Sequence, residues 1–213
     1  MRIKWGSVMK TVLIASQKGG AGKTTIAKNL AVAAAIEGSQ VMMFDMDPQQ
    51  SLREWYEQRE ADQPVMPGRD PGPKELKASI AAAERHNFDY LFIDTPPASD
   101  AWLSDAMKQA DLVVIPVRPS PTDLRAVKAT LRSAKEAKTD FCFFLSQTTR
   151  TRMTDEAARV LAEHGKLASV NLALRVVHAE TDANGRSVVE AEDAKAKDEL
   201  IRAWEFIQGQ IHG

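Results

Sequence analysis

The residues of this chain that are best suited to chemistry begin at position 18. The sequence Lys-Gly-Gly-Ala-Gly-Lys-Thr-Thr fills positions 18–25, between an apolar run and an alanine-rich stretch that continues to Gly38. Glycines let a backbone wrap closely around a phosphate, and a helix that follows adds unpaired N–H groups and the positive end of its dipole. This strand–loop–helix order predicts a site for the phosphates of a nucleotide.

The side chains at the end of the loop predict a triphosphate together with a metal ion. Lys23 is placed to reach the β and γ phosphates, and the hydroxyl of Thr24 is placed to ligate Mg²⁺. We therefore expect ATP and Mg²⁺ as ligands. The ATP-binding residues predicted in the loop are Lys18, Gly19, Gly20, Ala21, Gly22, Lys23, Thr24 and Thr25.

Three aspartates stand at the ends of two further apolar runs. Asp45 ends the first run and Asp47 follows two positions later, whereas Asp94 ends the second run. Ligands of open α/β sheets bind beyond the carboxyl ends of the strands, and residues two apart in an extended chain point to one side. Carboxylates in that place can support Mg²⁺ hydration and can orient or deprotonate water. We expect Asp94 to hold a Mg²⁺-bound water opposite Thr24.

Short apolar runs alternate with longer amphipathic stretches along the chain. This alternation predicts a doubly wound α/β domain, with a mostly parallel sheet and helices on both faces. The predicted strands are Thr11–Ala15, Val41–Asp45, Tyr90–Asp94, Leu112–Val117, Phe141–Leu145 and Val170–Val176. The predicted helices are Lys23–Glu37, Ser51–Glu60, Lys74–His86, Asp100–Gln109, Thr122–Lys138, Thr154–His164 and Ala194–Ile211.

Composition narrows the class of protein further. The 213 residues carry a net charge of −1, which gives no overall attraction to nucleic acid. The single cysteine, Cys142, lies in an apolar run, so we expect a buried thiol rather than a disulfide or a cysteine metal site. Without a membrane-length apolar stretch or a secretory signal, a cytoplasmic protein is expected. We expect a disordered leader over residues 1–9 and a single domain over residues 10–213.

The phosphate loop departs from the standard pattern, because Gln17 stands where the first glycine would be. The stretch Gln17-Lys18-Gly-Gly-Ala-Gly-Lys-Thr-Thr resembles the deviant Walker A motif of the ParA/MinD family of ATPases. The stretch Asp45-Met-Asp-Pro-Gln and the segment that ends at Asp94, a Walker B motif, resemble the same family. The likeness is closest to short ParA-type partitioning ATPases that lack an N-terminal DNA-reading domain, and it weakens after about residue 145.

This resemblance implies the P-loop NTPase fold and a role for each motif residue. In that family the early lysine reaches across a dimer interface to the nucleotide of the other subunit, which implies that Lys18 is catalytic together with Lys23. The second acid of the pair is associated with activating the attacking water, and this acid is Asp47 here. The implied metal residues, acting directly or through water, are Thr24, Asp45 and Asp94.

The resemblance also implies partners. ATP binding would drive dimerisation, the dimer would bind DNA non-specifically over the nucleoid, and a ParB-like or other cargo adaptor would stimulate hydrolysis. The cargo would be plasmid DNA, chromosomal DNA or another large body. Gln147 falls where many relatives carry an asparagine near the adenine, and Arg150 matches a family arginine used for DNA binding. Arg175 and Arg186 lie in stretches that resemble other basic positions.

Two other functions use related scaffolds. One is an ATP-dependent synthetase that acts on a small molecule, similar to dethiobiotin synthetase, although Lys18 and the aspartate pair argue against it. The other is a MinD-like, membrane-associated regulator of the division site, which would need a membrane-binding C-terminal helix. The helix predicted over Ala194–Ile211 carries several acids and lacks a cluster of lysines and arginines, so we expect it to pack against the core and membrane association to be absent.

Overall fold

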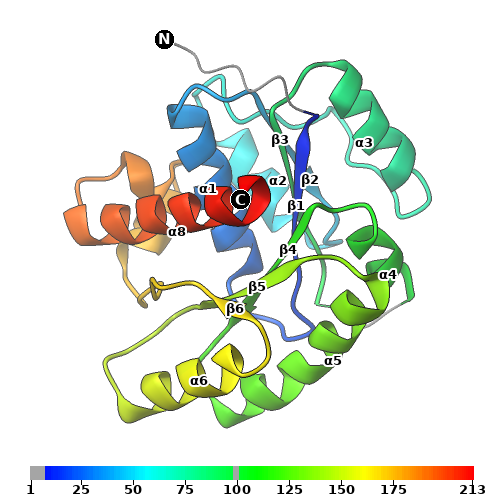
Figure 1. Ribbon diagram of the computed structural model, residues 1–213. Helices are drawn as coiled ribbons and strands as arrows, with labels where there is room; N and C mark the ends of the chain where they lie inside the picture. Colours follow the sequence, from blue (N-terminus) through cyan, green and yellow to red (C-terminus); the bar gives the residue numbers. More distant parts are fainter. Residues whose placement is uncertain (1–7, 98–100) are drawn as a thin grey trace.

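The apolar runs form the strands of one parallel sheet, since strands that are covered on both faces must be apolar throughout. The computed structural model describes residues 8–97 and 101–213 (Figure 1). Among these residues the sheet has six strands in the order β2-β3-β1-β4-β5-β6, and neighbouring strands run parallel. The strands are β1 (Lys10–Ile14), β2 (Val41–Asp45), β3 (Tyr90–Asp94), β4 (Leu112–Val117), β5 (Phe141–Leu145) and β6 (Lys166–Leu167).

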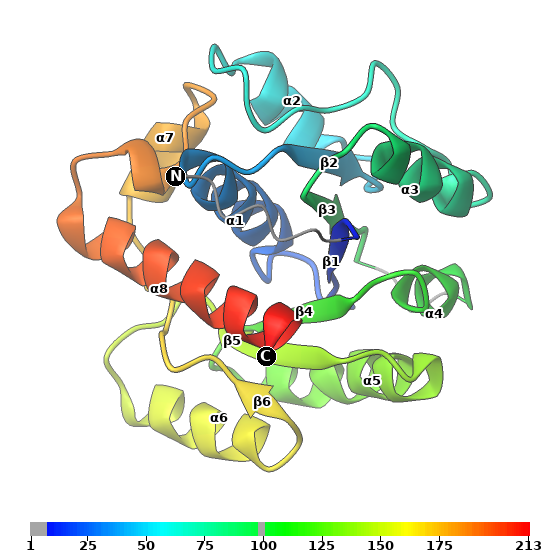
Figure 2. The same cartoon turned by 45° about the horizontal axis from the view of Figure 1, so that its top comes forward.

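Helices cover both faces of the sheet, as Figures 1 and 2 show. The helices are α1 (Lys23–Ile36), α2 (Ser51–Glu57), α3 (Leu76–Arg85), α4 (Ala101–Met107), α5 (Pro121–Ala137), α6 (Arg152–Ala162), α7 (Val177–Asp182), the short 3₁₀ helix η1 (Val188–Glu190) and α8 (Ala194–His212). Within β1, Val12 and Ile14 join the core beneath α1, α2 and α8, whereas Leu13 joins the core beneath α3, α4, α5 and α6. The predicted doubly wound α/β fold is therefore confirmed.

The predicted strand Val170–Val176 is wrong. The edge strand of the sheet is the two-residue β6, and the predicted segment forms one isolated bridge, between Ala173 and Thr148. The backbone of Gln147 has a left-handed conformation (φ 50°), which turns the chain away directly after β5. The segment keeps only a few backbone hydrogen bonds, to Leu145 at the end of β5 and to Thr148 beyond it, and so forms no regular strand.

Two short helices were not predicted, and the predicted leader lies mostly outside the described residues. Helices α7 and η1 occupy a stretch that has no clear apolar period. Of the predicted leader, residues 1–7 lie outside the described residues, and Met9 is buried in the core. Asp100, the predicted first residue of the fourth helix, also lies outside them.

The predicted burial of Cys142 and the predicted packing of the C-terminal helix against the core are confirmed. Cys142 is fully buried on β5. Helix α8 packs its apolar side on α1, with Leu200, Trp204 and Ile207 in the core. Among the described residues, none of the helices combines the length and the apolar character that a membrane span requires.

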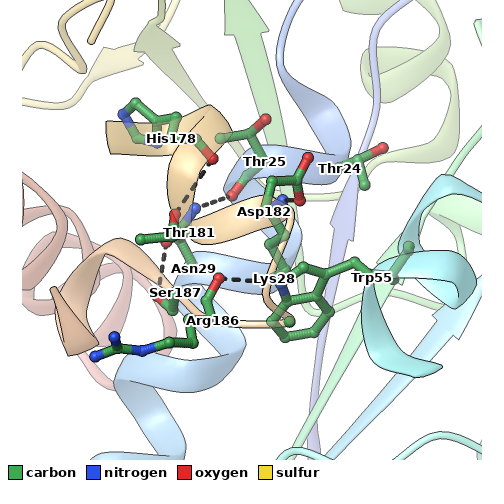
Figure 3. A network of polar contacts seen from close by, with 12 residues as sticks. Thr24, Thr25, Lys28, Asn29, Trp55, His178, Thr181, Asp182, Arg186 and Ser187 are labelled. Atoms are coloured by element: carbon green, nitrogen blue, oxygen red, sulfur yellow. Dashed lines mark hydrogen bonds and ion pairs between the residues drawn. The ribbon is translucent and has the colours of Figure 1, made fainter. Parts of the chain in front are cut away.

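Helix α1 is attached to a distant part of the chain through Asn29, as Figure 3 shows. The side-chain oxygen of Asn29 accepts hydrogen bonds from the hydroxyl of Ser187 (2.6 Å) and from the backbone N–H of Val188 (2.8 Å). Its side-chain nitrogen donates to the carbonyl of Thr25 (2.7 Å), within α1. Both the oxygen and the nitrogen of this buried amide are thereby used to fix α1 against the segment that precedes α8.

The neighbouring residue Lys28 joins α1 to two more helices. Its ammonium group forms an ion pair with Asp182 of α7 and lies 5.7 Å from the centre of the Trp55 ring of α2. Lys28 is only 2% exposed, and burial lowers its pKa to about 8. The charge is therefore costly to bury, and the carboxylate of Asp182 offsets part of that cost.

We expect Asp182→Ala to lower the free energy of unfolding by about 1–2 kcal/mol, because it leaves the buried ammonium of Lys28 without its counter-ion. Urea denaturation followed by tryptophan fluorescence measures the change. Glu180→Ala removes an exposed acid from the same helix and serves as the control, with an expected change below about 0.5 kcal/mol. Equal stabilities of the two variants would contradict this account of Lys28.

Candidate nucleotide-binding site

The glycine-rich loop joins the end of β1 to the start of α1 and leaves the helix terminus open. Gly20 (φ 72°) and Gly22 (φ 88°) have left-handed backbone conformations that other residues adopt only with strain. Gly22 is also the first flanking residue of α1, and no side chain caps the helix there. Uncapped N–H groups and the helix dipole make this terminus suited to an anion.

Residues that follow β5 hold the loop from one side. The hydroxyl of Ser146 donates to the carbonyl of Ala21 (2.8 Å), and the side-chain amide of Gln147 donates to the carbonyl of Gly20 (2.8 Å). Ser146 was not among the predicted site residues, because nothing in its local sequence distinguishes it from other serines at strand ends. These two bonds attach the loop to the segment that follows β5.

Asp94 and Thr24 meet beneath the loop. The hydroxyl of Thr24 donates to Oδ2 of Asp94 at 2.5 Å, whereas Oδ1 of Asp94 is buried and has no hydrogen-bond partner among the described residues. Burial of the carboxyl group raises the pKa of Asp94 to about 7, although the bond from Thr24 opposes the shift. An unpaired carboxylate oxygen beside a hydroxyl is a donor set that suits Mg²⁺.

This donor set fits a metal that is held largely by its substrate. No group of three or more His, Cys, Asp or Glu residues in the described part of the chain could enclose a metal ion. Mg²⁺ in nucleotide sites typically takes one or two protein ligands and completes its shell with phosphate oxygens and water. The pair Thr24–Asp94 meets that requirement.

Asp45 and Asp47 have different surroundings. Asp45 is 3% exposed, and its carboxylate accepts hydrogen bonds from the backbone N–H groups of Asp47 (3.0 Å), Leu52 (2.9 Å) and Arg53 (3.0 Å). Burial raises the pKa of Asp45, and these three bonds oppose the rise. Asp47 is half-buried, and its carboxylate accepts a hydrogen bond from the N–H of Gln49 (3.0 Å). Asp45 thus fixes the loop that carries Asp47.

The two lysines of the loop lie on different sides of it. Lys23 is 6% exposed; burial lowers its pKa, and the charges of Asp94 and Asp47 work against that shift. Lys18 is half-buried, and its charge contributes to the low pKa of Asp123 at the start of α5. Lys23 therefore interacts electrostatically with the acids at the ends of β2 and β3, whereas Lys18 interacts with Asp123 of α5.

A cavity of about 200 Å³ adjoins the loop on the side of α1. Gly22, Thr25 and Asn29 of the helix side and Gln147 of the β5 side line it, together with His178 of α7. Its lining is more apolar than polar, which suits a nucleotide base at the end of a phosphate site, so we name it the base cavity. Gln147, which was predicted to lie near the adenine, lines this cavity.

Comparison with known proteins places the chain in a family. Residues 12–197 match the family described as the CobQ/CobB/MinD/ParA nucleotide binding domain. The chain belongs to this family. Because that match covers most of the chain, the resemblance to ParA/MinD ATPases is confirmed.

Two relatives share a name. The chain is 34% identical over 134 residues to Maintenance of carboxysome distribution protein A of Halothiobacillus neapolitanus, an alignment that covers 60% of this chain and 59% of that protein. It is 32% identical over 163 residues to the protein of the same name from Gloeobacter kilaueensis, which covers 75% of this chain and 74% of that protein. The chain thus spans less than two thirds of the first relative.

A solved structure supports the fold. The ATP complex of a Cyanothece McdA variant matches this chain with a TM-score of 0.73, over 97% of each chain and at 19% identity. At that identity the likeness concerns the fold alone. The two chains therefore share their fold over almost the whole length.

The three arginines predicted to bind DNA differ in their partners. Arg150 is exposed and lines a polar hollow of about 480 Å³ together with Arg175. The guanidinium of Arg175 is ion-paired with Glu199 of α8, so it is the least available of the three. Arg186 is exposed and donates to the backbone carbonyl of Glu190. Arg150 and Arg175 thus line one hollow, and Arg186 is not part of its lining.

Asp94→Asn tests whether the buried carboxylate is kept for a ligand. We expect this variant to be more stable than the original by about 1–2 kcal/mol without nucleotide, because a buried charge is removed. It should also lose the gain in melting temperature that MgATP gives, which thermal scans with and without MgATP measure. Asp140→Asn, at an exposed position, is the control and should change neither quantity. An Asp94→Asn protein that MgATP still stabilises fully would contradict the assignment.

Proposed function

We propose that this chain is an ATPase that binds ATP with Mg²⁺, forms a homodimer in the ATP state and hydrolyses ATP when a partner stimulates it. The observation that carries the proposal is the buried pair Thr24–Asp94 at the start of an uncapped helix, with one carboxylate oxygen left without a partner among the described residues. The pair suits Mg²⁺, and the helix terminus suits the phosphates beside it.

Each charged side chain has a role that follows from its place. Lys23 neutralises oxygens of the β and γ phosphates. Asp47 orients the water that attacks the terminal phosphate, and its charge acts on Lys23 and on Asp94. Asp45 holds the backbone of Asp47 and supports Mg²⁺ hydration through water. Mg²⁺ would be held by Thr24 and Asp94, and it would neutralise charge that develops between the phosphates.

Lys18 completes the site of a second copy of the chain. Its charge acts on Asp123 of α5, whereas Lys23 interacts with Asp94 and Asp47, so Lys23 would be the cation that binds the phosphates within the same chain. A cation that arrives from the other subunit stabilises the charge on the transferring phosphoryl group. Hydrolysis then depends on dimerisation.

The cargo is proposed from the family and from the two relatives. Their shared name refers to carboxysome distribution, and the family name includes ParA. We propose that the chain positions or segregates plasmid DNA, chromosomal DNA or another large body, and that a ParB-like or other adaptor links it to that cargo. Arginines of two subunits, Arg150 first among them, would bind DNA phosphates non-specifically and only in the dimer, so the ATP-bound form would lie on the nucleoid.

Lys18→Ala separates binding from catalysis. We expect its affinity for MgATP to stay within about threefold and its turnover to fall at least about a hundredfold, because only charge in the transition state is left unstabilised. Titration with the analogue AMP-PNP and a phosphate-release assay measure the two quantities. Lys74→Ala, at an exposed position before α3, is the matched control. Unchanged turnover in Lys18→Ala would remove this lysine from the mechanism.

A mixing experiment tests whether Lys18 acts on the other subunit. The Lys18→Ala chain should bind nucleotide but cannot supply Lys18 to the other subunit. The Lys23→Ala chain keeps Lys18 but should not bind nucleotide itself. An equimolar mixture should regain part of the turnover if Lys18 acts across the dimer. If Lys18 acts within its own chain, the mixture stays inactive.

Arg150→Ala should weaken the ATP-dependent retention of long, non-specific DNA. Loss of one phosphate contact per subunit lowers the slope of log affinity against log salt concentration by about 1 per contact. DNA retention at several salt concentrations, with ATP, with ADP and without nucleotide, measures this slope. Arg85→Ala, an exposed arginine at the end of α3, is the control. Identical slopes for the two variants would exclude Arg150 from the DNA interface.

A further inference from the structure

Arg118 lies beside the phosphate loop and has no role in the function proposed above. It directly follows β4, and β4 pairs with β1, the strand that leads into the loop. The terminal nitrogen Nη1 of Arg118 lies 3.6 Å from the point where a Cβ on Gly20 would stand. Apart from the loop's own neighbouring residues, no other heavy atom of the described chain lies within 4 Å of that point, so Arg118 is the side chain that a Cβ on Gly20 would meet.

Asp123 holds the guanidinium in one orientation. Nε of Arg118 donates to Oδ1 of Asp123 (2.9 Å), and Nη2 donates to Oδ2 (3.3 Å). This side-on pair uses two of the three guanidinium nitrogens, and Nη1 has no recorded hydrogen bond among the described residues. The free nitrogen is therefore the one that faces the loop.

Asp123 is itself fixed. It is 4% exposed and accepts a hydrogen bond from the hydroxyl of Ser120 (2.5 Å), the residue that caps α5. Burial alone raises the pKa of Asp123, but the bonds from Arg118 and Ser120 outweigh burial and lower it. Asp123 thus remains ionised and keeps Arg118 beside the loop before any ligand arrives.

The base cavity lies on the opposite side of the loop from Arg118. That cavity is lined from α1, α7 and the segment after β5, whereas Arg118 is held from α5, which covers the other face of the sheet. A phosphate held by the loop can therefore be approached by Arg118 from the α5 side without obstructing the base cavity. Lys18 contributes charge on this same side.

We propose that Arg118 is a phosphate-binding residue that recognises the terminal phosphate of ATP through Nη1, with Asp123 as its positioning residue. The proposal rests on the proposed function, because it needs ATP in the loop. An Arg side chain suits this role: its charge is permanent, and its fork can bind a carboxylate on one edge while another nitrogen binds phosphate. It gives the site a means to distinguish ATP from ADP.

Arg118→Ala tests this assignment through nucleotide selectivity. We expect the affinity for AMP-PNP to fall about tenfold and the affinity for ADP to change by less than about twofold, because only the triphosphate reaches Arg118. Fluorescence titrations in the presence of Mg²⁺ measure both affinities. Arg125→Ala, at an exposed position within α5, is the matched control and should bind both nucleotides normally.

A structural role for Arg118 gives a different result. If the arginine only attaches α5 to β4, Arg118→Ala lowers the melting temperature and either reduces the affinities for AMP-PNP and ADP equally or changes neither. Either result overturns the proposal. The double variant Arg118→Ala/Asp123→Ala removes the carboxylate that the single variant leaves buried without its counter-ion. It should recover stability and still show the loss that is selective for AMP-PNP. If the unaltered chain has no Mg²⁺-dependent affinity for AMP-PNP, both this proposal and the proposed function fail.

Discussion

The hydrogen bond between Thr24 and Asp94 is the interaction on which the rest of the site depends. It joins the first turn of α1 to the end of β3, so it sets where the helix begins relative to the sheet. The same bond leaves half of a buried carboxylate unpaired, and burial holds the pKa of that group near 7. A protein interior tolerates such a group when a ligand offsets its cost.

The sequence predicts the parts of the structure that follow from local patterns. Strands β2, β3, β4 and β5 have the predicted bounds, because each is an apolar run with polar or turn-forming neighbours. The phosphate loop is equally local, since its glycines, Lys23 and Thr24 are contiguous. The roles assigned to these residues remain predictions, but the structure brings Lys23, Thr24 and Asp94 together as their spacing implies.

The parts that the sequence does not predict depend on contacts between distant segments. The left-handed turn at Gln147 ends β5 abruptly, and the apolar alternation of Val170–Val176 carries no sign of it. Ser146 and Arg118 reach the loop only because β4 and β5 follow β1 in the sheet. The local hydrophobic pattern of the sequence does not predict this strand order. Asp45 likewise points to backbone N–H groups of α2, although its spacing from Asp47 suggested that both face one side.

The burial of α1 has a consequence for how the molecule can respond to its ligand. Ten of the fourteen residues of this helix are buried, and its alanines let the sheet and α8 approach it closely. Packing at that density leaves the helix no room to slide or tilt. The helix that begins at the phosphate loop is therefore rigid. A structural response to a nucleotide bound there would fall instead on residues 46–50 and 118–120, which lie outside the regular helices and strands.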